Sequence, residues 1–347
     1  MTGLRSGLHG AAFLALGITL GAGTGGAAEV DGPMLNWDIA LIGPSRSVTV
    51  IFEETAKRLE QATDGKFKIK LHYNAQLAPE KEILDGLSVG AFQLGWVVPG
   101  YAPGKLVTAS ALDLPFLPAP DARALVSMSH AYLQIPETVA DFGRWGTRYI
   151  HTVPLPVYEF MGKGKAPQTV ADFKGQRLRM IGGLSDVMRS AGAVPTNFPV
   201  SDIFGALERN MLDGVTLAYN GFQAYRMYEI CTWYSKGIAL SPPASLFVGN
   251  LKALESLPPQ YATLLRDAAA TAAAKQIDTM MDGEDKAEAV FKQKGVQQVN
   301  FPAAERDKLI AFAQPIWDKW VHDVTPKGIP GQKLLDFILD TAKKPKS

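Results

Sequence analysis

Hydrophobic and polar residues alternate strictly along residues 66–74, a pattern that predicts a half-buried β-strand. Its apolar face carries Phe67, Ile69, Leu71 and Tyr73, and its polar face carries Lys66, Lys68, Lys70 and His72. Residues 49–65 and 80–91 instead repeat their apolar positions at helical spacing, and apolar runs at 35–43 and 92–98 are typical of two more strands. Strands that alternate with helices predict an α/β architecture with a mainly parallel sheet.

Residues 256–295 have a different character, because they are rich in alanine and charge and their apolar positions recur at helical spacing. Ser256 is the predicted N-cap of this long helix, and Gly283 is its weak point. Such a helix is far longer than the globular average of about twelve residues, so we expect it to span more than one domain. Two shorter helices are predicted near residues 303–321 and 332–342.

The composition is that of a globular protein with room for two domains: 347 residues, a net charge of +1 and 47% hydrophobic residues. A charge near zero leaves no basic face, so no nucleic-acid partner is expected. The chain has no internal repeat and no long low-complexity linker. Two domains would therefore be joined by ordered crossings, which favours a hinge with a cleft. No large apolar seam is evident, which favours a monomer.

A secretory signal peptide is predicted for residues 1–28. Arg5 precedes an apolar run of about ten residues, and small residues follow up to Ala28, the expected cleavage site. The alternative, a membrane anchor, needs about 20 apolar residues, and this run is shorter. The mature protein is therefore expected to be exported and soluble.

Known catalytic motifs are missing from the sequence. It has no nucleophile elbow, no phosphate-binding Walker loop and no zinc-protease motif. Its five histidines are scattered, so neither a metal site nor a cofactor is expected. A carboxylate pair brought together by the fold stays open as an alternative.

Arg177 and Arg179 alternate with Leu178 and Met180 in a strand-like stretch that ends in a glycine pair. A strand repeats every two residues, so both arginines point to one face. Two explanations are about equal on the residues alone. At least one arginine binds a negative ligand, or it pairs with an acidic residue of the protein.

Five segments in order resemble the solute-binding proteins of TRAP transporters. They are "NAQLAPEKEILDGLSVGAFQLG" at 74–95, "ALDLPFL" at 111–117, "DFKGQRLRM" at 172–180, "LERNMLDGV" at 207–215 and the long helix at 256–295. Each segment alone is a weak signal, but the resemblance covers nearly all of the mature chain.

The resemblance implies an α/β, two-lobed periplasmic binding protein fold with a ligand cleft at the hinge. Lobe I would comprise residues 29–153 with parts of 250–347, and lobe II residues 154–249. The long helix would back both lobes, and helices would fill residues 296–347. A periplasmic location, a small organic acid as ligand and membrane permease subunits as partners are also implied.

The same resemblance makes Arg179 the candidate clamp for a ligand carboxylate, with Arg177 as its surface neighbour. Many members carry an asparagine where this chain has Leu217. Tyr219 and Asn220 lie just beyond and are expected to cover and hydrogen-bond the ligand.

Glu159 would repel a second carboxylate or pair with Arg179 in the empty site. This favours a monocarboxylate with hydroxyl, amino or aromatic groups over a C4-dicarboxylate.

Weaker cleft candidates complete the predicted site: Arg46, Gln76, Glu80, Tyr101, Phe116, Tyr158, Phe222 and Phe247. Two alternative functions stay open. One is an exported enzyme that acts on a small acid with Glu159 or Glu80 as its base. The other is a sensor of the same fold that reports the ligand to a membrane receptor.

Overall fold

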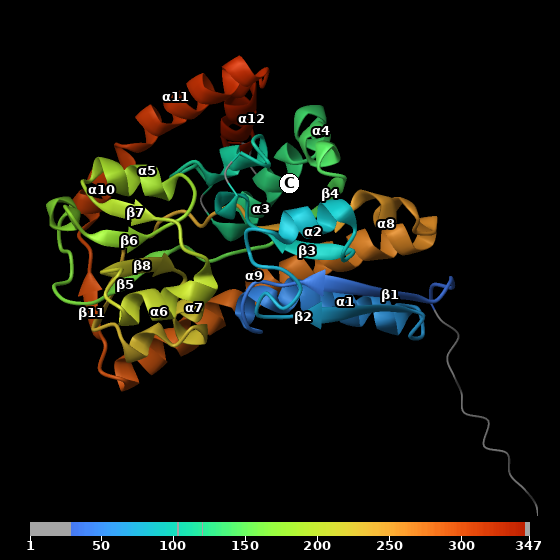
Figure 1. The fold of residues 1–347 in the computed structure, drawn as a ribbon, viewed down its shortest axis with the longest axis horizontal. Helices are drawn as coiled ribbons and strands as arrows, with labels where there is room; N and C mark the ends of the chain where they lie inside the picture. Colours follow the sequence, from blue (N-terminus) through green and yellow to red (C-terminus); the bar gives the residue numbers. More distant parts are fainter. Residues whose placement is uncertain (1–28, 103, 120, 344–347) are drawn as a thin grey trace, which may run out of the picture.

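The computed structural model describes residues 29–102, 104–119 and 121–343 and confirms the two-lobed α/β fold (Figure 1). The predicted signal peptide lies outside the described residues. Lobe I is built on a five-stranded sheet in the order β2-β1-β3-β10-β4. Lobe II is built on a six-stranded sheet in the order β11-β9-β5-β8-β6-β7. No helix in the described part of the chain is both long and apolar enough to cross a membrane.

Helices cover the strands of lobe I on both sides. Its elements are β1 (Leu35–Ala40), α1 (Val50–Ala62), β2 (Phe67–His72), α2 (Ile83–Val89), β3 (Leu94–Val97), α3 (Ala122–Tyr132), α4 (Pro136–Arg144), β4 (Thr147–Thr152), β10 (Leu246–Asn250) and α8 (Leu251–Glu255). Three 3-10 turns belong to the same lobe: η1 (Ser47–Thr49), η2 (Pro99–Tyr101) and η3 (Ala109–Asp113).

Lobe II is assembled from shorter elements. They are β5 (Glu159–Gly162), β6 (Arg177–Arg179), α5 (Leu184–Ser190), β7 (Val194–Thr196), α6 (Ile203–Glu208), β8 (Gly214–Leu217), α7 (Tyr219–Ala224), β9 (Trp233–Lys236), β11 (Gln297–Asn300) and α10 (Ala303–Ile310). The 3-10 turns η4 (Val170–Phe173), η5 (Val200–Asp202) and η6 (Met227–Glu229) connect them.

Both sheets are mixed, which corrects the expectation of a mainly parallel sheet. β1 runs parallel to β2 and β3, but β10 is antiparallel to β3 and β4, and β5 is antiparallel to β8 and β9. The reason is the crossing between lobes, because β5 and β10 are each the first strand after the chain changes lobe and enter the sheet from the opposite end.

Strand membership also differs from the predicted domain limits. β10 lies almost wholly before the expected boundary at residue 249 and yet belongs to the sheet of lobe I. β11 pairs with β9 in lobe II, although only helices were expected from residue 296 onward. Each strand follows a crossing of the chain, and sequence periodicity carries no signal for which sheet a strand joins.

The predicted long helix is α9 (Pro259–Gln293), 35 residues in length. It packs against α1 and β4 in lobe I and against α7 and β11 in lobe II, so it backs both lobes (Figure 1). Ser256 does not cap it; the Ser256 hydroxyl donates to the carbonyl of Ala253 at the end of α8. Pro258 is the residue that precedes the first turn of α9.

A buried polar side chain, Gln276, fixes α9 to its neighbours. Gln276 accepts a hydrogen bond from the Ile51 amide at 2.8 Å and donates to the Pro154 carbonyl at 2.7 Å. Pro154 lies in the first crossing between the lobes, so Gln276 connects α9 to α1 and to that crossing at once.

Gly283, the predicted weak point of α9, is a contact point with η1. A Cβ atom added at Gly283 would lie 2.5 Å from the Ser47 hydroxyl oxygen and 2.6 Å from the Ser47 Cβ. We therefore expect Gly283→Ala to lower the free energy of unfolding by about 1–2 kcal/mol, because overpacking outweighs the gain of about 1 kcal/mol in helix propensity. Urea denaturation measures this. Adding Ser47→Gly should restore stability, and a double variant as unstable as Gly283→Ala would contradict the contact.

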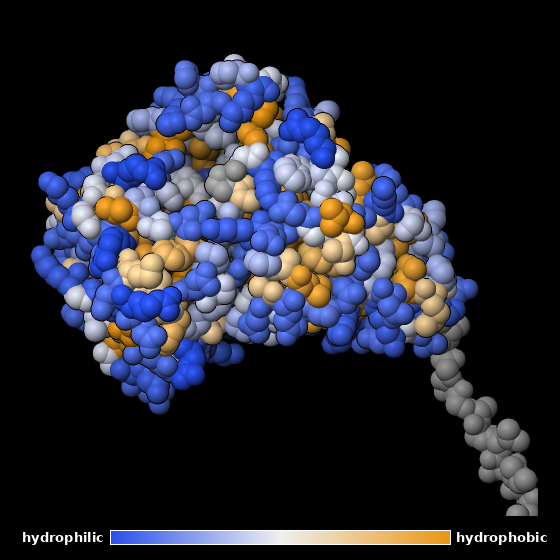
Figure 2. All heavy atoms as spheres, in the orientation of Figure 1, coloured by the Kyte–Doolittle hydropathy of each residue, from blue (hydrophilic) through white to orange (hydrophobic). Residues whose placement is uncertain are grey.

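The C-terminal helices join the lobes on another side. α11 (Ala313–Val324) packs against α5 of lobe II and against α12 (Gly331–Lys343), which in turn packs against α3 of lobe I (Figure 1). The short turn η7 (Thr325–Lys327) connects the two helices. The indole of Trp317 donates to the Pro115 carbonyl at 2.9 Å, and that of Trp320 to the Ser110 hydroxyl at 3.1 Å. Figure 2 shows a mainly hydrophilic face with apolar residues scattered in small groups.

Candidate functional site

The two arginines of β6 have different surroundings although they share one face of the strand. Arg177, at the start of β6, is exposed and forms a two-pronged ion pair with Asp213, with Nη2–Oδ1 at 2.6 Å and Nε–Oδ2 at 3.0 Å. Arg179, at the carboxyl end, is fully buried. Arg177 pairs with Val194 of β7, whereas Arg179 pairs with both Thr196 of β7 and Val215 of β8 and so lies between two neighbouring strands.

Arg179 donates only to neutral oxygen atoms. Its Nε bonds to the Phe198 carbonyl at 3.0 Å, its Nη1 to the Thr216 carbonyl at 3.4 Å and its Nη2 to the Tyr101 hydroxyl at 2.7 Å. A guanidinium has five N–H groups, so one on Nη1 and one on Nη2 have no recorded acceptor. Among the described residues no acid forms an ion pair with Arg179. A buried cation without a counter-charge is costly, so this site favours an anion.

Arg46 lies in lobe I, in the loop that follows β1. Its Nη1 donates to the carbonyls of Ile42 at 3.1 Å and Pro44 at 2.8 Å, which fixes the guanidinium group. The guanidinium carbon lies 5.1 Å from the Trp96 ring centre and 5.6 Å from that of Tyr225 in lobe II. Arg46, too, has no acidic partner among the residues that the structure describes.

Three tyrosines connect the two arginines. Burial raises the pKa of Tyr225 to about 12 and also raises the pKa of Tyr101 and Tyr158, while the nearby charges of Arg46 and Arg179 oppose each rise. All three hydroxyls are therefore neutral at physiological pH. We call these five residues, Arg46, Tyr101, Tyr158, Arg179 and Tyr225, the arginine–tyrosine cluster.

Hydrogen bonds across the lobes surround the cluster. The side-chain amide of Asn197 donates to the Gly100 carbonyl at 3.0 Å, and the Ser201 amide donates to Glu80 at 3.4 Å. Glu80 is buried and its charge raises the pKa of Tyr101 and Tyr225, so it is the acid nearest the cluster. The site thus contains two arginines and one nearby carboxylate, which is an excess of positive charge.

Tyr219 and Asn220 lie elsewhere, at the start of α7. Their backbone amides donate to the two carboxylate oxygens of Glu284 in α9 at 2.7 and 3.0 Å, and the Asn220 side chain also donates to Glu284. The Tyr219 hydroxyl donates to the Ser235 carbonyl at 2.8 Å. These contacts join lobe II to the long helix and give both residues a structural role, while their contact with a ligand stays a prediction.

We expect Glu284→Ala to lower the free energy of unfolding by about 2–3 kcal/mol, because it leaves two buried amides of α7 without an acceptor. Denaturant titration of the purified protein measures the change. The neighbouring Asp285 is exposed, so Asp285→Ala is the matched control and should have little effect. Equal effects of the two substitutions would contradict the anchoring role of Glu284.

Glu159 does not face the cluster either. Its carboxylate accepts hydrogen bonds from the Ser235 hydroxyl at 2.6 Å and from the amides of Gly237 and Ala239 at 2.9 and 3.0 Å. Burial raises its pKa, and these donors oppose the rise. Glu159 therefore holds the second crossing between the lobes in place, and its contacts support neither the predicted pairing with Arg179 nor a role as catalytic base.

Three further candidates also lie apart from the cluster. Phe222 is buried in lobe II beside Tyr219 and Phe291, and Phe247 packs edge-on against Phe52 at 5.1 Å in the core of lobe I. Gln76 is exposed. Of the sequence candidates, the structure thus brings together Arg46, Tyr101, Tyr158 and Arg179, with Glu80 close by.

Three residues beside or within the cluster were not predicted from the sequence: Trp96, Asn197 and Tyr225. Asn197 directly follows β7, and the carboxyl end of a strand is where ligands bind in α/β folds, so its position was an available signal. Trp96 lies inside a buried strand and Tyr225 after a short helix. Neither position differs in sequence from an ordinary core aromatic residue.

The glycine pair after β6 meets Asp113 of lobe I. The Gly183 amide donates to the Asp113 carbonyl at 3.1 Å, and a Cβ atom at Gly183 would lie 2.4 Å from that carbonyl oxygen. Gly182 has a φ of +63° and packs against the Asp113 side chain, whose Oδ1 accepts from the Ala244 amide at 2.8 Å. Glycine at these positions permits close backbone contact between the lobes.

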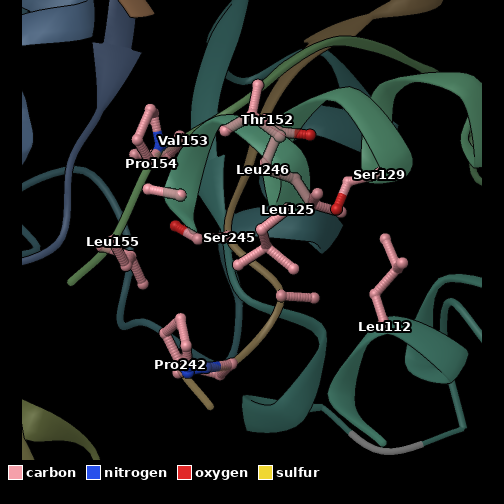
Figure 3. Close-up of a pocket in the computed structure, with 14 residues that line it drawn as sticks. Leu112, Leu125, Ser129, Thr152, Val153, Pro154, Leu155, Pro242, Ser245 and Leu246 are labelled. Atoms are coloured by element: carbon pink, nitrogen blue, oxygen red, sulfur yellow. The ribbon is translucent and has the colours of Figure 1, made fainter. Parts of the chain in front are cut away.

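A cavity of about 20 Å³ lies where the two crossings, residues 153–155 and 242–246, pass each other (Figure 3). About one water molecule fits such a volume, so an organic ligand does not. Larger surface hollows of about 730 and 830 Å³ occur, but the arginine–tyrosine cluster lines neither. Within the described residues, no group of three or more histidine, cysteine, aspartate or glutamate side chains could hold a metal ion.

Sequence relatives and solved structures agree with this architecture. A monocarboxylate 2-oxoacid-binding periplasmic protein of Nostoc is 27% identical over 253 residues, which are 68% of this chain and 65% of that protein. The match to another curated relative, a solute-binding protein, spans only 49% of that relative's length.

Two solved structures show the same fold. A marine metagenome TRAP solute-binding protein specific for aromatic acids, in complex with metahydroxyphenylacetate, superposes with a TM-score of 0.80 at 19% identity, covering 89% of this chain and 98% of that one. A TRAP periplasmic protein of Xanthobacter autotrophicus with bound β-D-galacturonate gives 0.76 at 20% identity, covering 89% and 100%.

The family model of bacterial extracellular solute-binding proteins, family 7, matches residues 43–323, which include the whole arginine–tyrosine cluster and every described strand except β1. Its members and the structural neighbours are binding proteins of TRAP transporters and not enzymes. The chain therefore belongs to bacterial extracellular solute-binding protein family 7, the solute-binding proteins of TRAP transporters.

Proposed function

We propose that this protein is the extracytoplasmic solute-binding subunit of a TRAP-type transporter, and that Arg179 clamps the carboxylate of a small organic acid between the lobes. The observation that carries the proposal is the burial of Arg179 together with its incomplete set of hydrogen bonds. It is fully buried, donates only to neutral oxygens, and keeps one free N–H on each terminal nitrogen. A carboxylate supplies the missing charge and accepts two parallel hydrogen bonds.

The ligands named for the relatives support this choice. One relative binds 2-oxoacids, one aromatic acids and one galacturonate. These molecules differ in size, ring and hydroxyl content, and they share a carboxylate. A carboxylate shared by otherwise different ligands fits a single arginine clamp.

Capture follows from contacts between the lobes. Tyr101 of lobe I and Arg179 of lobe II bond directly, so a carboxylate on Arg179 is held at the interface and favours the closed arrangement. The predicted signal peptide exports the chain, and cleavage after Ala28 releases it as a monomer. The closed complex then delivers the bound acid to the membrane permease subunits. The exported-enzyme alternative is set aside, because the family consists of binding proteins.

The proposal is tested by isothermal titration of the mature protein, after dialysis against denaturant and refolding to remove bound solute. The panel pairs small carboxylic acids with their amides, which keep the shape and lose the charge. We expect at least one acid to bind and its amide to bind at least 100-fold more weakly, in line with the loss of a buried charge pair. Binding of an amide as tightly as its acid, or of no acid at all, would refute the proposal.

A further inference from the structure

The arginine–tyrosine cluster contains buried polar atoms that the protein itself leaves unbonded. Among the described residues, four buried side-chain atoms have no hydrogen-bond partner: Arg46 Nε, Ser47 Oγ, Asn197 Oδ1 and Tyr225 Oη. Ser47 belongs to the contact with Gly283 in α9. Of the other three atoms, Arg46 Nε and Tyr225 Oη belong to the cluster, and Asn197 lies beside it through its bond to the Gly100 carbonyl. Buried polar groups of native proteins rarely stay unpaired.

Arg46 and Tyr225 form one polar end of the site. A Cβ atom at Gly43 would lie 1.8 Å from the Tyr225 hydroxyl and 2.9 Å from Arg46 Nη1, so both groups meet above the same glycine. The Arg46 guanidinium carries the unbonded Nε donor, and Tyr225 carries an unbonded hydroxyl that donates or accepts. A ligand hydroxyl satisfies both atoms at once, because it accepts one bond and donates another.

Arg179 forms the other polar end, and an aromatic ring packs against the guanidinium group at each end. Tyr101 stands 5.5 Å from the Arg179 guanidinium carbon, and Trp96 lies 5.1 Å from that of Arg46. Tyr158 interacts electrostatically with both arginines. Flat aromatic walls favour a flat aromatic ligand, since offset stacking adds to the burial of its surface.

The charge of the site limits the ligand further. Arg46 and Arg179 contribute two positive charges, and Glu80 contributes one negative charge close to Tyr101 and Tyr225. One excess positive charge matches a monoanion. A second carboxylate near Glu80 would be repelled, which excludes a dicarboxylate, and the three unbonded atoms are too few for the many hydroxyls of a sugar acid.

We propose that the ligand is an aromatic monocarboxylate with a ring hydroxyl, whose carboxylate binds Arg179 and whose hydroxyl binds Arg46 and Tyr225. The inference rests on the proposed function, because it assigns Arg179 to the carboxylate. Tyr225 is then the residue that selects for the hydroxyl, and Trp96, Tyr101 and Tyr158 select for the ring.

The test is a titration cycle in which a hydroxyl is removed from the ligand, from the protein, or from both. Wild type, Tyr225→Phe and the control Tyr228→Phe are titrated with benzoate, 3-hydroxybenzoate, 4-hydroxybenzoate and cyclohexanecarboxylate. Tyr228 lies three residues further along and packs against Phe291, outside the cluster.

In wild type we expect the tighter-binding of the two hydroxybenzoates to bind about ten-fold more tightly than benzoate, because it gains one buried hydrogen bond. We expect cyclohexanecarboxylate to bind more weakly than benzoate. Tyr225→Phe should abolish the hydroxyl preference, and Tyr228→Phe should keep it. A preference that survives Tyr225→Phe, or an aliphatic acid that binds as tightly as the aromatic ones, overturns the inference and leaves the clamp intact. Failure of every acid, aliphatic ones included, refutes the proposed function instead.

Discussion

Arg179→Met is expected to weaken binding of the organic acid by roughly 200- to 5,000-fold. The substitution keeps most of the side-chain volume and removes the charge, so the ligand carboxylate would be buried without a partner, at a cost of about 3–5 kcal/mol. Isothermal titration with the best acid of the panel measures the loss. An affinity within a few-fold of wild type would show that the carboxylate binds elsewhere.

The same variant separates a binding role from a structural one. The guanidinium of Arg179 is buried and has no acid beside it in the described part of the chain, so its removal relieves a desolvation cost. We therefore expect the melting temperature of the ligand-free protein to stay close to wild type. A collapse of stability in Arg179→Met without ligand would mean that Arg179 holds the lobes together for their own sake.

Arg177→Met is the matched control for Arg179→Met, because it removes an arginine from the same strand. Arg177 is exposed and its ion pair with Asp213 lies at the surface. Exposed ion pairs contribute little to stability, so both binding and melting temperature should remain near wild type. A large loss of affinity in Arg177→Met would show that Arg179→Met weakens binding by disturbing the strand and not by removing a contact with the ligand.

Asp113→Asn is expected to remove a large part of the fall in stability between pH 4 and pH 7. Burial raises the pKa of Asp113 from 3.8 to about 7, and the hydrogen bond from the Ala244 amide opposes this only in part. In this window the folded state binds more protons at Asp113 than the unfolded state. The free energy of unfolding therefore decreases as pH rises from about 4 to about 7 and is then constant.

The size of the Asp113 effect follows from the difference between its pKa in the folded protein, about 7, and its ordinary pKa of 3.8. About three pH units correspond to on the order of 4 kcal/mol for a single fully buried group. Asparagine keeps an oxygen for the Ala244 amide and carries no charge, so Asp113→Asn should be more stable than wild type at pH 8 and similar at pH 4. Urea denaturation at both values measures this difference. Other carboxyls titrate equally in both proteins and cancel in the comparison.

Asp318→Asn, at an exposed position of α11, serves as the control for the pH experiment. Its stability should follow the wild-type curve at every pH. If Asp113→Asn also follows the wild-type curve, the Asp113 carboxyl is hydrated in solution and the contact of Gly182 with it is not tight.

Sequence periodicity was enough to predict most elements, including α9 and its reach across two domains. Helical and strand spacing arises from neighbours a few residues apart, and the length of α9 exceeds what one lobe can pack against. The motif around residues 172–180 also singled out Arg179 over Arg177. The arginine's burial and free N–H groups, by contrast, became visible only in the folded chain.

The sequence by itself therefore determined the α/β elements, the long helix and the arginine that is central to the proposed site. Tertiary structure alone decided which sheet β10 and β11 join. It also decided which of the other predicted site residues lie near Arg179 and which form structural contacts elsewhere. Glu284 accepts from Asn220 across 64 positions, Ser235 bonds Glu159 across 76, and Arg179 meets Tyr101 across 78. Hydrogen-bond partners so distant leave no periodic trace in the chain, because only the packing of the lobes brings donor and acceptor together.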